Sequence, residues 1–172
     1  IRVVIGGSWD QWYEESGGAG GVAFVNSWQW SNDTPVFVFE ENLANGDAKY
    51  TAEAISHEVG HSLGLSHQST YDNGNKIEYN PGSGSGDTGW APIMGVGYYQ
   101  NLTTWHNGTS SLGSTSYQDD MSIISASNNG FGGYRLDDRG NTISSATALS
   151  GTTTLTGSGV IEQTSDIDVF SF

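Results

Sequence analysis

The feature that most constrains this chain is the segment 57–67, which reads HEVGHSLGLSH. His57 and His61 are four residues apart, so both imidazoles lie on the same face of an α-helix. Gly64 is suited to end that helix, because glycine readily adopts the left-handed conformation that turns a chain away. We expect the chain to return beyond Gly64 and to bring His67 to the same point in space as the other two histidines.

Three imidazoles that meet at one point are typical of a zinc site, in which each nitrogen lies about 2.0–2.1 Å from the metal. Three protein ligands leave one position of a tetrahedral zinc open, whereas structural zinc sites are closed by four ligands. The chain has no cysteine, so thiolate sites, disulfides and a cysteine nucleophile are excluded. The sequence therefore predicts one catalytic Zn²⁺ held by His57, His61 and His67.

Glu58 adjoins the first of these histidines, so it is expected beside the metal rather than on it. Zinc lowers the pKa of a bound water to about 7, and a neighbouring carboxylate can take a proton from that water. The same carboxylate can then deliver the proton to a departing amine. We therefore expect a hydrolase in which Glu58 is the general base.

Acidic residues dominate the charge of this 172-residue chain, with nineteen Asp and Glu against five Lys and Arg and a formal net charge of −14. Binding to nucleic acid or to an anionic membrane needs a basic patch, which five cations cannot easily form. No apolar run approaches the roughly 18 residues that cross a bilayer. We therefore expect no nucleic-acid partner and no membrane span.

Apolar runs and turn residues predict an α+β domain in which three strands precede the histidine segment. The expected strands are 1–5, as a buried strand, 22–25 and 36–39; the expected helices are 45–63 and 117–125; the stretches 9–21 and 69–90 are expected to be irregular. In the first helix, an apolar stripe through Ala52, Ile55, Val59 and Leu63 is expected to face the core, opposite the imidazoles.

The composition changes after residue 130, where Ser, Thr and Gly become dominant. We expect one catalytic domain at 1–130, followed at 131–172 by a linker and the start of a β-rich module. A segment of that length is too short to form an independent core. Because the chain begins at Ile1 with strand-like residues, we expect it to be part of a longer precursor.

The histidine segment resembles the extended motif of the metzincin clan of zinc endopeptidases, and residues 91–95 (APIMG) resemble its Met-turn. The resemblance covers about residues 1–130. It implies a zinc-dependent endopeptidase with a twisted mixed sheet packed on the zinc-binding helix, a loop-rich lower subdomain and a late helix. It also implies that Met94 lies beneath the zinc ligands and that the first elements of the full domain are missing here.

The same resemblance implies that extended polypeptide substrates pair antiparallel with an edge strand, for which residues 21–25, with Val22, Ala23 and Phe24, are the best candidates. Two positions depart from family patterns. Gln68 follows the third histidine, and Val96 stands where some families have a tyrosine that stabilises the oxyanion. Tyr98 comes later, and it is either a hydrogen-bond donor to the transition state or an aromatic wall of the pocket.

The sequence as a whole is most similar to secreted bacterial metzincins of the serralysin-like or reprolysin-like kind. Residues 136–172 resemble the opening of a bacterial pre-peptidase C-terminal domain, which implies export to the extracellular space. We expect a monomer. Calcium is a further candidate ligand at Asp119–Asp120 or Asp137–Asp138, although neither pair has the spacing of a calcium loop. Charge at a helix start and a solvated turn are the alternatives for these two pairs.

Two other functions stay open at this point. The same metal chemistry would serve a zinc hydrolase that acts on a non-peptide amide or ester. Alternatively, an incomplete domain would be a catalytically inactive binding or adhesion module.

Overall fold

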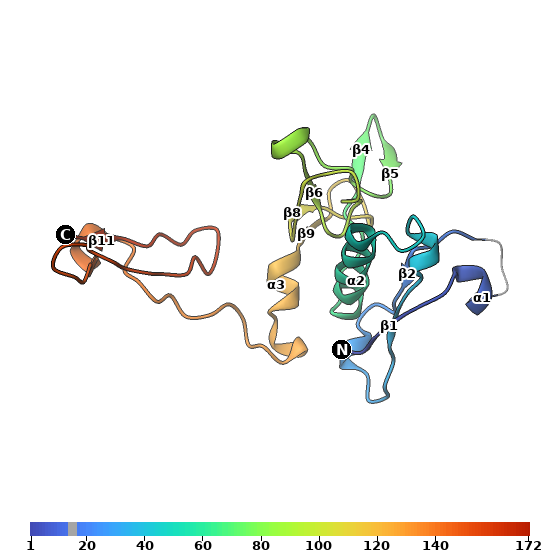
Figure 1. The fold of residues 1–172 in the computed structure, drawn as a ribbon, viewed down its shortest axis with the longest axis horizontal. Coiled ribbons are helices and arrows are strands. Elements are labelled where there is room, and N and C mark those ends of the chain that lie inside the picture. Colours follow the sequence, from blue (N-terminus) through green and yellow to red (C-terminus); the bar gives the residue numbers. More distant parts are fainter. Residues whose placement is uncertain (14–16) are drawn as a thin grey trace.

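The computed structural model describes residues 1–13 and 17–172 (Figure 1). A three-stranded mixed sheet contains β1 (Val3–Ile5), β2 (Gly21–Val22) and β3 (Val36–Val38). Its order is β1-β3-β2, with β3 parallel to β1 and antiparallel to β2. The predicted α+β class is confirmed, and β2 lies at an edge of the sheet.

Two expectations for the N-terminal part are wrong. Strand β1 is not fully buried, because it forms the other edge of the sheet: Val3 and Val4 are half-buried and Ile5 is 51% exposed. The stretch expected to be irregular contains a short helix, α1 (Trp9–Tyr13). The indole of Trp9 stacks on the ring of Tyr13, with ring centroids 4.4 Å apart. The backbone N–H of Trp9 donates a hydrogen bond to Asn42 Oδ1 at 2.7 Å.

The histidine segment lies at the end of α2 (Ala48–Ser62), as the sequence predicts. The helix begins after Asp47, whose carboxylate accepts a hydrogen bond from the Tyr50 N–H at 3.0 Å and so satisfies a free backbone donor of the first turn. It ends before Gly64, which has a φ of 108°. The helix packs on β3, and the buried core there contains Val38, Leu43 and Ala54.

The predicted apolar stripe of α2 is only partly correct. Ile55 packs against that core and Leu63 is buried, but Ala52 is exposed. Ala54 and Glu58 are buried instead, because α2 is covered both by the sheet and by the segments that follow the helix.

The region 69–90 is more ordered than the sequence analysis expects. It contains a hairpin of β4 (Thr70–Asp72) and β5 (Asn75–Ile77). Asn73 and Gly74 connect the two strands with φ values of 48° and 84°, as a type I′ turn requires. The Asn-Gly pair is the sequence signal for this hairpin.

Two further strand pairs follow, β6 (Trp90–Pro92) with β7 (Leu102–Thr104), and β8 (Asn107–Thr109) with β9 (Tyr117–Asp119). The late helix, α3 (Asp120–Ile124), therefore begins three residues later than expected, because residues 117–119 pair with β8. Short 3₁₀ helices complete the fold at Ser27–Gln29, Glu40–Asn42, Gly86–Thr88, Ser127–Asn129 and Ile143–Ser145.

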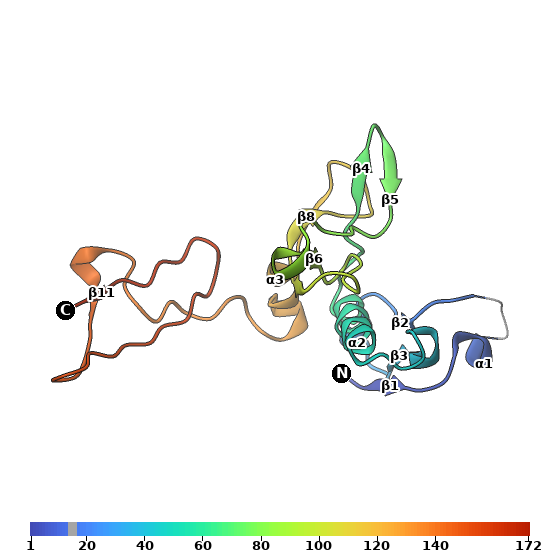
Figure 2. The same ribbon diagram turned by 45° about the horizontal axis from the view of Figure 1, so that its top comes forward.

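Residues beyond about 135 form an extended arm that leads away from the rest of the chain in both views (Figures 1 and 2). Its strands β10 (Thr147–Ala148) and β11 (Phe170–Ser171) pair in parallel. The domain boundary near residue 130 stays a prediction. Among the described residues, no helix has the length and apolar character needed to cross a membrane.

Candidate active site

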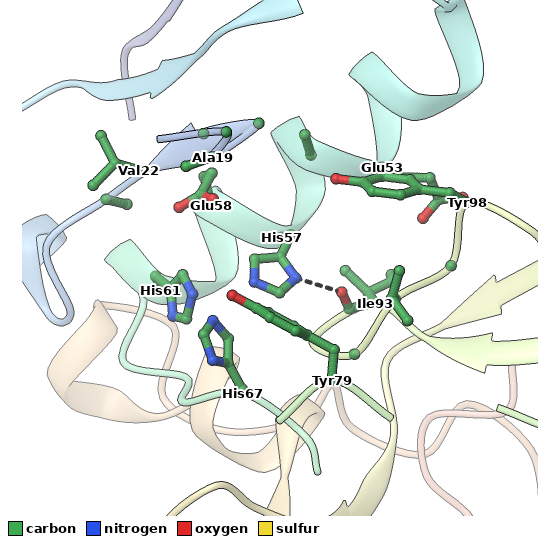
Figure 3. Close-up of a pocket in the computed structure, with 18 residues that line it drawn as sticks. Ala19, Val22, Glu53, His57, Glu58, His61, His67, Tyr79, Ile93 and Tyr98 are labelled. Carbon is green, nitrogen blue, oxygen red and sulfur yellow. Dashed lines mark hydrogen bonds between the residues drawn. The ribbon is translucent and has the colours of Figure 1, made fainter. Parts of the chain in front are cut away.

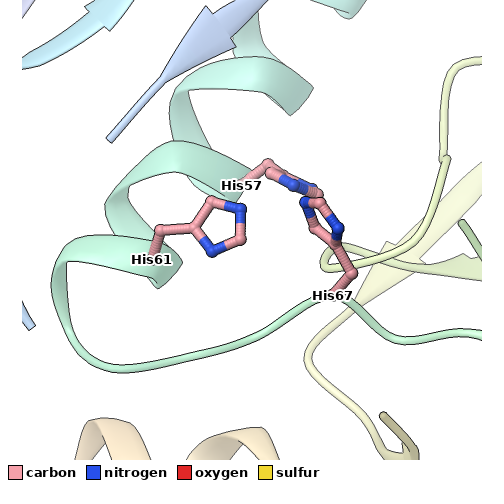
Figure 4. A group of neighbouring side chains, drawn as sticks. All are labelled: His57, His61 and His67. Atoms are coloured by element: carbon pink, nitrogen blue, oxygen red, sulfur yellow. The ribbon is translucent and has the colours of Figure 1, made fainter. Parts of the chain in front are cut away.

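Helix α2 and the loop after it bring the three predicted histidines together (Figure 4). The ring centroids of His57 and His61 lie 4.8 Å apart, and those of His67 lie 4.8 Å from His61 and 5.2 Å from His57. One nitrogen of each ring lies within 4.8 Å of the others. Because these atoms can share one ligand sphere, the spacing fits a single metal ion.

Hydrogen bonds fix the orientation of all three rings and leave the same nitrogen of each ring free. His57 Nδ1 donates to the carbonyl oxygen of Ile93 at 2.8 Å, and His61 Nδ1 donates to that of Leu65 at 2.7 Å. A carbonyl oxygen can only accept, so Nδ1 carries the proton and Nε2 of the neutral ring presents a lone pair. His67 Nδ1 bonds in the same way to Glu78 Oε1 at 2.6 Å. Histidines that bind zinc typically donate their other ring N–H to a carbonyl oxygen or a carboxylate in this way.

The protonation of the histidines also suits a metal. Burial lowers the pKa of His57 to about 3, with further lowering by the nearby His61 and His67. Burial lowers the pKa of His61 to about 4, again with a contribution from His67. Both rings are therefore neutral at pH 7, and neutral imidazole is the form that binds a metal.

Glu58 lies between α2 and the edge strand of the sheet, and it faces the same cavity as the histidines (Figure 3). Its side chain packs closely on β2, since a Cβ added at Gly21 would come within 2.7 Å of Glu58 Cγ. Burial raises the pKa of Glu58 to about 7, because the carboxylate loses hydration there. A group with this pKa can accept and return a proton near neutral pH.

The cavity has a volume of about 420 Å³. Segment 18–23 borders it on one side and segment 93–98 on the other, and Val22 and Ala23 are part of its lining. Phe24 is not; it is 61% exposed and packs near Trp30, with ring centroids 5.6 Å apart.

The expected strand 21–25 is therefore shorter in the structure, since β2 ends at Val22. The chain leaves the sheet because the Asn26 N–H bonds to the carbonyl oxygen of His61 at 3.0 Å and Asn26 adopts a φ of 64°.

Met94 is fully buried in a tight turn beneath α2, where the resemblance to a Met-turn places it. The turn is closed by the Gly95 N–H, which donates to Pro92 O at 2.9 Å. A Cβ added at Gly60 would come within 2.5 Å of Met94 Sδ, so the thioether lies directly against the helix between the two histidine turns. The neighbouring Ile93 supplies the carbonyl oxygen that holds His57.

The two tyrosines of the cavity lie in different places. Tyr98 stacks on Tyr50 with ring centroids 4.7 Å apart and packs against the core, so it forms an aromatic wall. Tyr79 lies instead against the histidines, 4.5 Å from His67 between ring centroids. Sequence analysis missed Tyr79 and its neighbour Glu78, and the Asn-Gly turn of the preceding hairpin could have drawn attention to this segment.

Neither aspartate pair considered for calcium gains support. Asp119 caps α3, and Asp120 is buried and accepts hydrogen bonds from a backbone N–H and two side-chain amides. These two carboxylates thus serve the fold. The carboxylate of Asp137 lies near those of Asp166 and Asp168, but acidic side chains often gather in this way without an ion.

A mixed sheet, a helix with two histidines and a third histidine from beyond a glycine fit a zinc metallopeptidase. Comparison with known families agrees: residues 5–68 match the reprolysin-like metallopeptidase family M12B, and residues 41–133, more than half of the chain, match the peptidase M66 family. The chain belongs to the peptidase M66 family. Neither a curated protein nor a solved structure matches it.

Proposed function

We propose that this chain is a secreted endopeptidase of metzincin type in which His57, His61 and His67 hold one zinc ion and Glu58 is the general base. The single observation that carries the proposal is the arrangement of the three Nδ1 hydrogen bonds, which leaves three converging Nε2 atoms beside a buried carboxylate. Zinc bound there would polarise the scissile carbonyl group and acidify the attacking water.

The residues of the chain divide the remaining work. Glu58 takes a proton from the attacking water, holds it in a site that favours its neutral form, and delivers it to the leaving amine. Met94 fills the space beneath the two helical histidines and so supports their position. Hydrogen bonds hold the three imidazole rings in the orientation that metal binding requires, so the rings do not have to rearrange during the reaction.

The edge strand would hold the substrate. One side of β2 pairs with β3 through Gly21 and Val22, and Val22 and Ala23 also border the cavity. An extended peptide would pair antiparallel with this free edge, next to Glu58. Phe24 would contact the substrate only outside the cavity, because its ring lies beside Trp30.

Secretion, a monomeric state and the bacterial, metzincin-type assignment belong to the same proposal. Support for metzincin type comes from His67 beyond Gly64 and from the buried Met94 turn. Support for secretion comes only from the resemblance of residues 136–172 to a pre-peptidase C-terminal domain.

A mass-spectrometric screen tests this function. The zinc-loaded chain is incubated with denatured proteins and, separately, with small amides and esters. We expect the wild type to release new peptides, and Glu41→Gln, a control at an exposed acidic residue, to release them at the same rate. Glu58→Gln should keep its zinc but release peptides at least 100-fold more slowly. Hydrolysis of small amides or esters alone would assign a different zinc hydrolase. Zinc binding without any hydrolysis would assign a binding module.

A further inference from the structure

Tyr79 extends across the cavity toward the three histidines (Figure 3). Its ring centroid lies 4.5 Å from that of His67 and 6.2 Å from that of His57. Figure 3 shows the hydroxyl end of the side chain directed at the space that the imidazoles enclose. Among the described residues, no group forms a hydrogen bond with this hydroxyl, so its proton is available to a ligand.

The backbone on both sides of Tyr79 is fixed. The carbonyl oxygen of Glu78 accepts a hydrogen bond from Ser69 Oγ at 2.6 Å, while the Glu78 carboxylate holds His67. On the other side, the Asn80 N–H donates to Gln68 O at 2.8 Å. The backbone that carries Tyr79 is thus held on both sides although the residue is 45% exposed, and a held backbone favours the preorganised donor that such a site requires.

Negative charge that forms on a substrate in this cavity would have to be stabilised by a neutral hydrogen-bond donor, because none of the described lining residues is Lys or Arg. Lys49 lies nearby, but its ammonium group donates to the carbonyl oxygens of Gly97 and Tyr98. Burial and the charges of Glu78 and Glu58 raise the pKa of Tyr79, so the phenol keeps its proton at neutral pH.

We propose that Tyr79 is a catalytic residue whose hydroxyl donates a hydrogen bond to the oxyanion that forms on the scissile carbonyl oxygen. This inference rests on the proposed peptidase function. When water attacks the carbonyl carbon, the C=O π electrons move to oxygen, Glu58 accepts one proton of the water, and Tyr79 stabilises the oxyanion without losing its own proton. The C=O bond then re-forms, the C–N bond breaks, and Glu58 returns its proton to nitrogen.

The test compares Tyr79→Phe with the wild type on a fluorogenic peptide taken from a cleavage mapped in the protein screen. Loss of one oxyanion donor costs about 100-fold in kcat. We expect that loss with KM within about threefold and with the zinc content unchanged. A peptide phosphonamidate, which places a tetrahedral anion at the reacting centre, should bind about 100-fold more weakly to the variant in calorimetry. An unreactive peptide of the same sequence should bind equally to both proteins.

Two further variants complete the design. Tyr117→Phe, at a 73% exposed position outside the cavity, should match the wild type in all five quantities: kcat, KM, zinc content, and affinity for the phosphonamidate and for the unreactive peptide. Tyr98→Phe should lose much less activity than Tyr79→Phe. Unchanged kcat and phosphonamidate affinity in Tyr79→Phe would overturn the assignment, and so would a loss of zinc that explains the loss of activity. A wild type that neither cleaves peptides nor binds the phosphonamidate would overturn the proposed function itself, whereas an active wild type with an unaffected variant overturns only the role of Tyr79.

Discussion

His67 and Glu78 are joined by a hydrogen bond of 2.6 Å between Nδ1 and Oε1. Glu78 also forms an ion pair with Lys76 at 2.6 Å, so the carboxylate is held from two sides. The third histidine comes from a loop rather than from the helix, and this contact replaces the backbone carbonyl oxygens that orient the other two rings. The hairpin that carries Glu78 therefore helps to form the metal site.

Replacing Glu78 should weaken zinc binding without unfolding the protein. Carboxylates that orient a ligating histidine typically contribute 10- to 100-fold to metal affinity. We expect Glu78→Ala to lower the zinc affinity within that range in a competition titration with a chelator. Asp72→Asn, on the exposed part of the same hairpin, should leave the affinity unchanged. Equal affinities of Glu78→Ala and the wild type would show that His67 needs no such support.

The close packing of α2 on Met94 predicts a cost for any side chain at Gly60. A Cβ there would come within 2.5 Å of Met94 Sδ and 3.2 Å of Leu65 Cδ1. Overpacking costs about 1–3 kcal/mol, and at a contact this close in a fully buried place we expect it to exceed the gain of about 1 kcal/mol in helix propensity.

Urea unfolding of Gly60→Ala should therefore show a lower free energy of unfolding than the wild type. The matched control is Gly113→Ala, because a Cβ at Gly113 meets nothing within 4 Å. A Gly60→Ala protein that is more stable than the wild type would mean that Met94 does not fill this space.

The raised pKa of Glu58 predicts a pH-dependent stability in the metal-free protein. Its pKa is about 7 in the folded chain against 4.5 in the unfolded chain. The unfolded state therefore loses its proton first as the pH rises, so folding is penalised increasingly between pH 4.5 and 7 and fully above pH 7. Glu58→Gln removes this penalty, which amounts to at most about 3 kcal/mol.

Chemical denaturation of metal-free wild type and Glu58→Gln at pH 4 and pH 8 measures the effect. The variant should be the more stable protein at pH 8, and the two should agree at pH 4. The Glu41→Gln control should follow the wild type at both values. A constant difference across this range would contradict the burial of an ionisable Glu58 in the folded state.

The parts of the site that the sequence predicts most directly are those that depend on local geometry. The four-residue spacing of His57 and His61 fixes their common face on any helix, and Gly64 indicates where the chain turns. The resemblance of residues 91–95 to a Met-turn draws attention to Met94, which is fully buried in the structure and lies against Gly60 of the helix; its role in supporting the zinc ligands stays a prediction.

Long-range pairing explains what sequence analysis missed. The residues of β1 are apolar enough for a central strand, and only the pairing of β3 with both neighbours makes β1 an exposed edge. Glu78 and Tyr79 reach the histidines because a hairpin and the Ser69 and Asn80 contacts carry them there. No periodicity within residues 69–90 reports such contacts, although the Asn73–Gly74 turn predicts the hairpin itself.

X-ray absorption at the zinc edge, on protein loaded with one equivalent of zinc, tests the central claim most directly. The arrangement of the three rings predicts three imidazole nitrogens at about 2.0–2.1 Å and one oxygen from solvent, with one nitrogen lost in His67→Ala. A spectrum with fewer than three imidazoles in the wild type, or one that His67→Ala leaves unchanged, would contradict it.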